Sequence, residues 1–223
     1  MSPAKTIIAI DENRLTRRVA SGLVFVLLGA ALLVLLSAPG IAATTGGVGS
    51  VGKKPLTPGD IERARGYFTD TELTTHDGRK VRFYSDMLDN RTVVINVIYT
   101  NCKGACPMIT QMLSLVSKEV GDRFGDDIHF VSISNDPERD TPEVLTEFAQ
   151  KQGVNLDGWS FLTGRKADVD QVIRKIGLYV ENFEQHKSML LIGNTRTGHW
   201  QKIPPNLPPQ AIVTKLKEVA DGV

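Results

Sequence analysis

One uninterrupted apolar segment places the strongest constraint on the fold of this chain. The segment VVINVIY, residues 93–99, is rich in β-branched side chains and is apolar almost throughout. This composition is typical of a strand that is buried on both faces of a sheet. A second segment of the same kind, IHFVSIS at residues 128–134, predicts another buried strand. Both strands therefore need helices on either side of them.

The rest of the chain alternates between strand-like and helix-like patterns. Apolar residues recur at helical spacing from Ile109 to Val120, and Thr141-Pro142-Glu143 has the cap, proline and acid of a helix start. Further predicted elements are a hairpin at residues 71–84, a short strand at 159–164, a helix at 167–177, a hairpin formed by 189–194 and 199–203, and a final helix at 208–221. This order predicts an α/β fold, with a mixed sheet flanked by helices.

The N-terminal part of the chain contains a membrane signal. Residues 19–36 are uncharged and apolar, and their number is close to that needed to span a bilayer. Arg14, Arg17 and Arg18 precede them, and the small residues of SAPGIAA follow. The segment is therefore predicted to be either a retained membrane anchor or a signal peptide that is removed. In both cases the positive charge stays inside and the rest of the chain is exported.

The composition after this segment predicts a tether and one folded domain. Residues 44–59 are rich in Gly, Thr and Pro, which is typical of a flexible linker. We expect residues 1–43 to form the membrane anchor or signal segment, and residues 60–223 to form a single domain without internal repeats. The formal net charge of the chain is +1, which offers no electrostatic footprint for nucleic acid.

The only two cysteines of the chain, Cys102 and Cys106, lie in a glycine-containing loop between a predicted strand and a predicted helix. A disulfide that closes so short a loop stabilises a fold weakly, by about 2 kcal/mol in the chain-entropy model. The loop also places sulfur near the N–H groups and the positive dipole end of a helix, which favours the thiolate form. We therefore expect reactive or metal-ligating sulfur rather than a structural disulfide.

The spacing of the cysteines leaves two kinds of chemistry open. Three intervening residues place the sulfurs at i and i+4, on one face of a helical turn, where both can reach one metal ion. A thiol–disulfide exchange centre more often has two intervening residues, but two neighbouring thiols can also pass electrons in pairs. Two thiolates are soft ligands that suit Cu(I), and one imidazole would complete a three-coordinate site that also holds Cu(II).

Four histidines are candidates for that imidazole. His76 lies in a predicted turn, where its Asp and Gly neighbours explain it, and His129 lies at the edge of a buried strand. His199 begins a late strand, which is typical of a surface position. His186 ends an irregular segment directly before an apolar strand, where a loop can bring a side chain over the helix N-terminus. Position alone therefore favours His186.

Three motifs occur together in one order: YTNCKGACP at residues 99–107, DPERDTPEVL at residues 136–145, and a histidine shortly before MLLIGN. With these motifs the chain resembles the Sco/SenC family, whose members are copper-binding proteins of the inner mitochondrial membrane and the bacterial envelope. The resemblance implies a thioredoxin-like mixed sheet flanked by helices, with an added N-terminal β-hairpin. It also implies that one copper ion is bound through Cys102, Cys106 and His186.

The resemblance further implies a role in assembling the dinuclear copper centre of cytochrome c oxidase. The expected protein is a membrane-tethered copper metallochaperone that carries Cu(I) or Cu(II) to the copper-receiving subunit of the oxidase, with other copper chaperones as further partners. The alternative is a thiol–disulfide oxidoreductase in which Cys102 and Cys106 reduce the cysteines of a partner protein, so enzymatic activity stays open, as does a sensor role. The expected location is membrane-anchored with the domain in the bacterial periplasm or cell envelope, and the mitochondrial inner membrane is less favoured.

Several residues near these motifs allow two interpretations. Lys103 stands where the family commonly has proline, and its cation would favour thiolate beside it. Met108 and Met112 offer thioethers that can bind Cu(I), but methionine here is more typical of core packing. The charged segment 136–140 is interpreted as a solvated loop that starts a helix, with contact to a partner protein as the alternative.

Overall fold

The computed structural model describes residues 57–179 and 188–222 of the chain. The predicted membrane segment, most of the predicted linker, and His186 lie outside these described residues. The helices are α1 (Pro58–Phe68), α2 (Ala105–Val120), α3 (Pro142–Lys151), α4 (Lys166–Lys175) and α5 (Pro209–Asp221), with a π-helix η1 (Phe83–Leu88) and a 3-10 turn η2 (Gly121–Arg123). The strands are β1 (Glu72–Thr75), β2 (Lys80–Arg82), β3 (Thr92–Ile98), β4 (Ile128–Ser134), β5 (Trp159–Thr163), β6 (Leu190–Asn194) and β7 (His199–Ile203).

The strands form one seven-stranded sheet in the order β2-β1-β5-β4-β3-β6-β7. The middle strands β5, β4 and β3 are parallel, and the strands on both sides of them pair antiparallel. The β1–β2 and β6–β7 pairs are the two predicted hairpins. The mixed α/β architecture and the added N-terminal hairpin are therefore confirmed. Because β3 and β4 are parallel, the segments that follow them leave from the same edge of the sheet.

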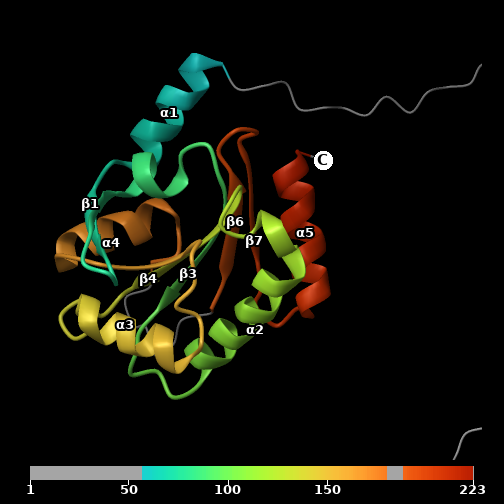
Figure 1. The fold of residues 1–223 in the computed structure, drawn as a ribbon. Coiled ribbons are helices and arrows are strands. Elements are labelled where there is room, and N and C mark those ends of the chain that lie inside the picture. The colour runs from blue at the N-terminus through green and yellow to red at the C-terminus, as the bar shows by residue number, and fades with distance from the viewer. Residues whose placement is uncertain (1–56, 180–187, 223) are drawn as a thin grey trace, which may run out of the picture. The chain divides into compact units, whose positions relative to one another are not determined.

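Helices cover both faces of the sheet, as the apolar central strands require. On β3, Val94 and Ile98 belong to a core shared with α2, α3 and α5, whereas Val93 and Ile95 belong to a second core shared with α1, α4 and η1. Figure 1 shows α2 and α5 together on one side of the sheet and α4 on the other. Each buried aliphatic side chain contributes roughly 1.5–3 kcal/mol through its removal from water. The two-sided burial of β3 therefore anchors the fold beneath the cysteine loop.

Helix α3 begins and ends close to where the sequence predicts. Thr141 is its N-cap, because the hydroxyl oxygen accepts a hydrogen bond from the N–H of Val144 at 3.4 Å. Pro142 follows as the first helical residue, and the last is Lys151. Gly153 then turns the chain with a φ of 67°, a conformation that suits glycine. These local signals set the two ends of α3.

Helix α1 and the π-helix η1 are not predicted from the sequence. Helix α1 begins at Pro58, inside the predicted linker, where the carboxylate of Asp60 accepts hydrogen bonds from the N–H and hydroxyl of Thr57 at 2.8 and 2.6 Å. Its other end packs on the sheet, with 4.6 Å between the ring centroids of Phe68 and Trp200. The helix depends on this tertiary contact, because its own sequence has little apolar periodicity.

No helix within residues 57–179 and 188–222 combines the length and the apolar character that crossing a bilayer requires. The uncharged segment at residues 19–36 lies outside these ranges. The membrane anchor therefore stays a prediction from the sequence.

Candidate metal centre

The cysteine loop joins the carboxyl end of β3 to the amino end of α2. Cys102 lies in this loop, and its N–H donates to the carbonyl oxygen of Tyr99 at 3.2 Å. Cys106 is the second residue of α2, and Gly104, the residue before the helix, provides no side-chain cap. Instead, the N–H of Cys106 donates to Sγ of Cys102 at 3.5 Å. A sulfur therefore occupies the position at which a helix N-terminus stabilises negative charge.

The two sulfurs differ in exposure. Cys106 is 1% exposed and belongs to the core that the sheet shares with α2, α3 and α5. Cys102 is half-buried and packs against the edge of that core. Both are free thiols. A metal ion or a partner protein that approaches from solvent therefore reaches Cys102 first.

The pKa values of the two thiols move in opposite directions. Burial alone would raise the pKa of Cys102, but hydrogen bonds, chiefly from the backbone N–H groups of Cys106 and Gly104, bring this pKa below its ordinary value of 9.0. Burial raises the pKa of Cys106 to about 12, and negative charge on Cys102 and Asp140 adds to the rise. The pair therefore favours a single thiolate, on Cys102.

A buried carboxylate holds the start of the cysteine loop. Asp140 is 1% exposed. Its carboxylate accepts hydrogen bonds from the N–H of Thr100 at 3.1 Å, and from the hydroxyl groups of Thr100 and Ser134, each at 2.5 Å. Thr100 follows β3 and Ser134 ends β4, so these bonds join both strand ends to the segment before α3. Asp140 thereby fixes the backbone two residues before Cys102.

The sequence interpretation of this segment is wrong for Asp140. A solvated loop describes Glu138 and Arg139, which are exposed, and Arg139 pairs with Asp136 at 2.9 Å. Asp140 is instead enclosed by the two strand ends. Its local sequence is as charged as that of its neighbours, so no signal in the sequence separates the buried carboxylate from the solvated ones.

A groove of about 610 Å³ opens beside Cys102, between the cysteine loop and α3. We call it the loop–α3 groove. It is lined by Thr100, Asn101, Cys102, Lys103, Pro107, Val144, Glu147, Phe148, Lys151 and Gln152. Near it, the side-chain amide of Gln111 on α2 donates to the carbonyl and side-chain oxygens of Gln152 at 2.8 and 2.9 Å. Helices α2 and α3 are thus joined next to the groove, which gives it walls on both sides.

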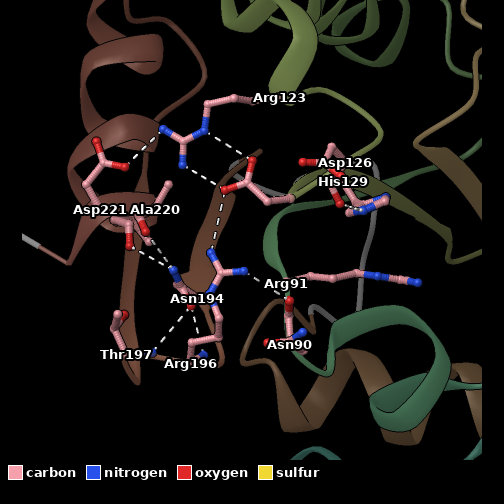
Figure 2. Close-up of polar contacts among 12 residues, drawn as sticks. Asn90, Arg91, Arg123, Asp126, His129, Asn194, Arg196, Thr197, Ala220 and Asp221 are labelled. Carbon is pink, nitrogen blue, oxygen red and sulfur yellow. Dashed lines mark hydrogen bonds and ion pairs between the residues drawn. The ribbon is translucent and has the colours of Figure 1, made fainter. Parts of the chain in front are cut away.

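Three of the four candidate histidines lie within the described residues. The ring of His76 lies 3.1 Å from the side-chain oxygen of Asn155, in the turn where the sequence places it. His129 lies at the amino end of β4, where its Nε2 is 2.9 Å from the carbonyl oxygen of Asp126 (Figure 2). His199 is half-buried and begins β7, rather than lying at the surface as predicted.

None of these three histidines completes a metal site with the cysteines. Within residues 57–179 and 188–222, no group of three or more Cys, His, Asp or Glu side chains is arranged to hold a metal ion. A histidine or carboxylate that joins Cys102 and Cys106 as a third ligand would therefore come from outside these ranges. His186 is one of the residues that lie there.

The two methionines near the loop have different environments. Met112 is partly buried against the core, as predicted. Met108 is 69% exposed, so the prediction of core packing is wrong for this residue. It lies on the solvent face of α2, in agreement with the apolar spacing, which begins only at Ile109.

The fold and the site together define a class of protein: a thioredoxin-like, helix-flanked sheet with a pair of unequal thiols at the amino end of a helix. A model of the SCO1/SenC family matches residues 62–221, which is more than two thirds of the chain. The chain therefore belongs to the SCO1/SenC family.

Individual relatives agree with this assignment. The chain is 34% identical over 88 residues to the SCO1 protein homolog of Bacillus subtilis, in an alignment that covers 40% of this chain and 44% of that protein. The chain spans less than half the length of the curated relatives that it matches.

Solved structures agree in fold. The structure of Bradyrhizobium japonicum ScoI with copper bound matches with a TM-score of 0.56 and 24% identity, covering 67% of this chain and 96% of that chain. The structure of BsSco, a protein with a disulfide switch that is described as a member of the Sco family of cytochrome c oxidase assembly proteins, matches with a TM-score of 0.57 and 22% identity, covering 76% of this chain and 94% of that chain.

Proposed function

We propose that this chain is a membrane-tethered copper metallochaperone that binds one copper ion through Cys102, Cys106 and His186 and helps to assemble the dinuclear copper centre of cytochrome c oxidase. Membership of the SCO1/SenC family supports this proposal, as does the similarity to a copper-bound ScoI. The proposed partners are the copper-receiving subunit of the oxidase and other copper chaperones.

The paired sulfurs are the observation that carries the proposal. The N–H of Cys106 lies 3.5 Å from Sγ of Cys102, so both cysteines lie at the same helix start, where one ion could contact both sulfurs. Thiolates are soft ligands that suit Cu(I), and an imidazole from His186 would extend the set to Cu(II). Metal binding replaces the proton that burial keeps on Cys106, so a cation with high affinity for sulfur is needed.

Transfer of the ion would begin at Cys102. This sulfur lines the loop–α3 groove, whereas Cys106 is 1% exposed. A partner thiolate would replace Cys102 first, and Cys106 would hold the ion until a second partner ligand arrives. The N–H of Cys106, 3.5 Å from Sγ of Cys102, would stabilise the displaced thiolate. The ion would thus stay bound to sulfur throughout the exchange.

The test is an anaerobic titration of the reduced full-length chain in detergent, with Cu(I) and separately with Cu(II). The expected result is one copper ion per chain and, for Cu(II), a thiolate-to-copper charge-transfer band. Cys102→Ser or Cys106→Ser should abolish the band, and His186→Ala should weaken it. His76→Gln is the matched control and should leave it unchanged. Absence of tight copper binding in the reduced protein would refute the proposal.

The unequal thiols favour a second candidate, a thiol–disulfide oxidoreductase. The Cys102 thiolate would attack a partner disulfide, forming a mixed disulfide and releasing one partner thiolate. Cys106 would then lose its proton and attack the sulfur of Cys102, forming the Cys102–Cys106 disulfide and releasing the second partner thiolate. Two electrons pass to the partner. Normal oxidase assembly with His186→Ala, combined with loss of assembly on Cys106→Ser, would support this function over copper delivery.

The location is also a proposal. We place residues 1–43 in or across the membrane, residues 44–59 as the tether, and the domain from residue 60 outside the cytoplasm, in the periplasm or cell envelope. Support comes from the arginines before the apolar segment. Protease treatment of intact spheroplasts should digest the domain, while carbonate washing should leave the chain with the membrane. Release by carbonate would indicate a removed signal peptide instead.

A further inference from the structure

The loop–α3 groove has an uneven distribution of charge. Lys103 faces it from the cysteine loop and Lys151 from the end of α3, and among the described residues of its lining Glu147 is the only acid. Both lysines are exposed. Across residues 57–179 and 188–222, the lysines that form ion pairs are Lys80 and Lys166. The two lysines of the groove therefore have no anionic partner in this part of the chain.

The helix ends modify this potential. The amino end of α2 adds positive potential beside Cys102, whereas the carboxyl end of α3 partly offsets the charge of Lys151. The highest positive potential in the groove is therefore expected at Lys103, next to the half-buried sulfur.

The floor of the groove is apolar. Pro107, Val144 and Phe148 contribute side chains to the lining, and Phe148 is only 7% exposed. Clefts of about 300–1,000 Å³ hold ligands of small-molecule size, so a groove of about 610 Å³ admits a short segment of a partner rather than a broad surface. A segment with acidic side chains would complement the two lysines.

We propose that the loop–α3 groove is the docking site for a short acidic segment of the partner protein, which presents the exchanging sulfur of the partner to Cys102. The inference rests on the proposed function, because both copper transfer and thiol exchange require a partner sulfur at Cys102. The apolar floor holds the segment, and Lys103 and Lys151 select its charge.

The test uses two synthetic peptides, each with a central cysteine activated as a 2-thiopyridyl disulfide. Glutamates flank the cysteine in one peptide and lysines in the other. In the reduced, copper-free full-length chain in detergent, the Cys102 thiolate attacks the peptide sulfur, and the released 2-thiopyridone is followed by absorbance. A substitution that alters the reactivity of Cys102 itself changes both rates by the same factor, because both peptides react with the same thiolate. The ratio of the two rates therefore reports only the preference for charge.

The acidic peptide should react about tenfold faster than the basic one at low salt, as expected for electrostatic steering. The double variant Lys103→Gln/Lys151→Gln should reduce the ratio of the acidic to the basic rate to about two. Lys103→Gln alone should account for the larger part of this loss. Lys217→Gln is the matched control, because Lys217 is an exposed lysine on α5 outside the groove. Its ratio should equal that of the unmodified chain.

Equal rates for the two peptides, or a ratio that survives loss of both lysines, would overturn the docking proposal. Copper stoichiometry, measured on the same preparations, separates this failure from failure of the proposed function. A chain that binds no copper but keeps its lysine-dependent preference contradicts the copper function and supports the docking site. A chain that binds copper without the preference contradicts the docking site alone.

Discussion

The two ends of the central strands are held by different kinds of interaction. At the amino end of β4, the guanidinium of Arg123 bonds to Asp127 at 2.7 Å. It also bonds to Asp221 at 3.0 Å (Figure 2). At the carboxyl end, one buried carboxylate, Asp140, holds the strand ends. At the start of α2, the N–H of Cys106 donates to the sulfur of Cys102 at 3.5 Å. The first end is closed by side chains, and the second presents a reactive group.

Asn194 shows how completely the amino end is closed. It is fully buried at the end of β6, and its side-chain N–H groups donate to the carbonyl oxygens of Val219 and Ala220 at 3.3 and 3.0 Å. Its side-chain oxygen accepts the N–H groups of Arg196 and Thr197 at 2.8 and 3.3 Å (Figure 2). One amide thus joins β6, the following turn and the last turn of α5.

The amino end of the central strands therefore serves the stability of the fold, whereas the carboxyl end serves the reactivity of the cysteines. Buried polar groups with a full set of partners hold one conformation. A helix start without a side-chain cap keeps N–H groups that can stabilise a thiolate or a ligand. We therefore expect changes at the amino end to affect unfolding, and changes at the cysteine end to affect sulfur chemistry.

The largest expected effect is the unequal reactivity of the two thiols. Thiolate is the reacting form, so alkylation by iodoacetamide should rise with pH through each pKa, below 9.0 for Cys102 and near 12 for Cys106. Cys102 should therefore carry far more thiolate than Cys106 at neutral pH. Mass spectrometry of the reduced full-length chain across pH measures both rates. Similar rates at pH 8 would remove the proposed asymmetry of the site.

The next effect concerns the amino end. Asn194→Ala leaves several buried backbone groups without their partner, which should lower the free energy of unfolding by about 3 kcal/mol. Urea unfolding of the full-length chain measures the loss. Asn206→Ala, at an exposed position, is the control and should change the free energy by less than about 0.5 kcal/mol. A small loss at Asn194 would show that the closed end contributes little to stability.

Asp140→Asn should affect both properties at the cysteine end. The amide keeps one acceptor oxygen but places N–H donors against the donors of Thr100 and Ser134, so about 2 kcal/mol of stability should be lost. Removing the negative charge should also lower the pKa of Cys106. Alkylation of Cys106 should then begin at lower pH, whereas Glu138→Gln should leave it unchanged. An unaltered pH profile with Asp140→Asn would limit Asp140 to a structural role.

The smallest effect on the free energy of unfolding is expected for the exposed ion pair at the amino end of the central strands. Arg196 lies 3.5 Å from Asp127, and its side chain is 38% exposed. Exposed ion pairs of this kind contribute little, so Arg196→Gln should lower the free energy of unfolding by about 0.5 kcal/mol, and by less at high salt. Urea unfolding at two salt concentrations measures this. A loss as large as that of Asn194→Ala would mean that the network acts as one unit.

Local signals account for the parts of the fold that the sequence predicts well. The buried strand at residues 93–99 and the helix start at Thr141 depend on the composition and cap of a few neighbouring residues. Helix α1 and the buried state of Asp140 depend on residues far away in the chain, Trp200 for α1 and Thr100 for Asp140. Periodicity carries no information about such partners, and these features were therefore missed.

The sequence by itself determined the sheet with helices on both faces, the pairing of two cysteines at a helix start, and the family, because each depends on residue types at fixed short spacings. The tertiary structure alone decided that Cys106 is buried while Cys102 borders a groove, and that Lys103 and Lys151 meet there. It also decided that the negative charge of Asp140 lies close enough to Cys106 to raise the pKa of that thiol. Exposure and electrostatic environment come from segments that meet only when β3, β4 and α3 pack together, so no short spacing encodes them.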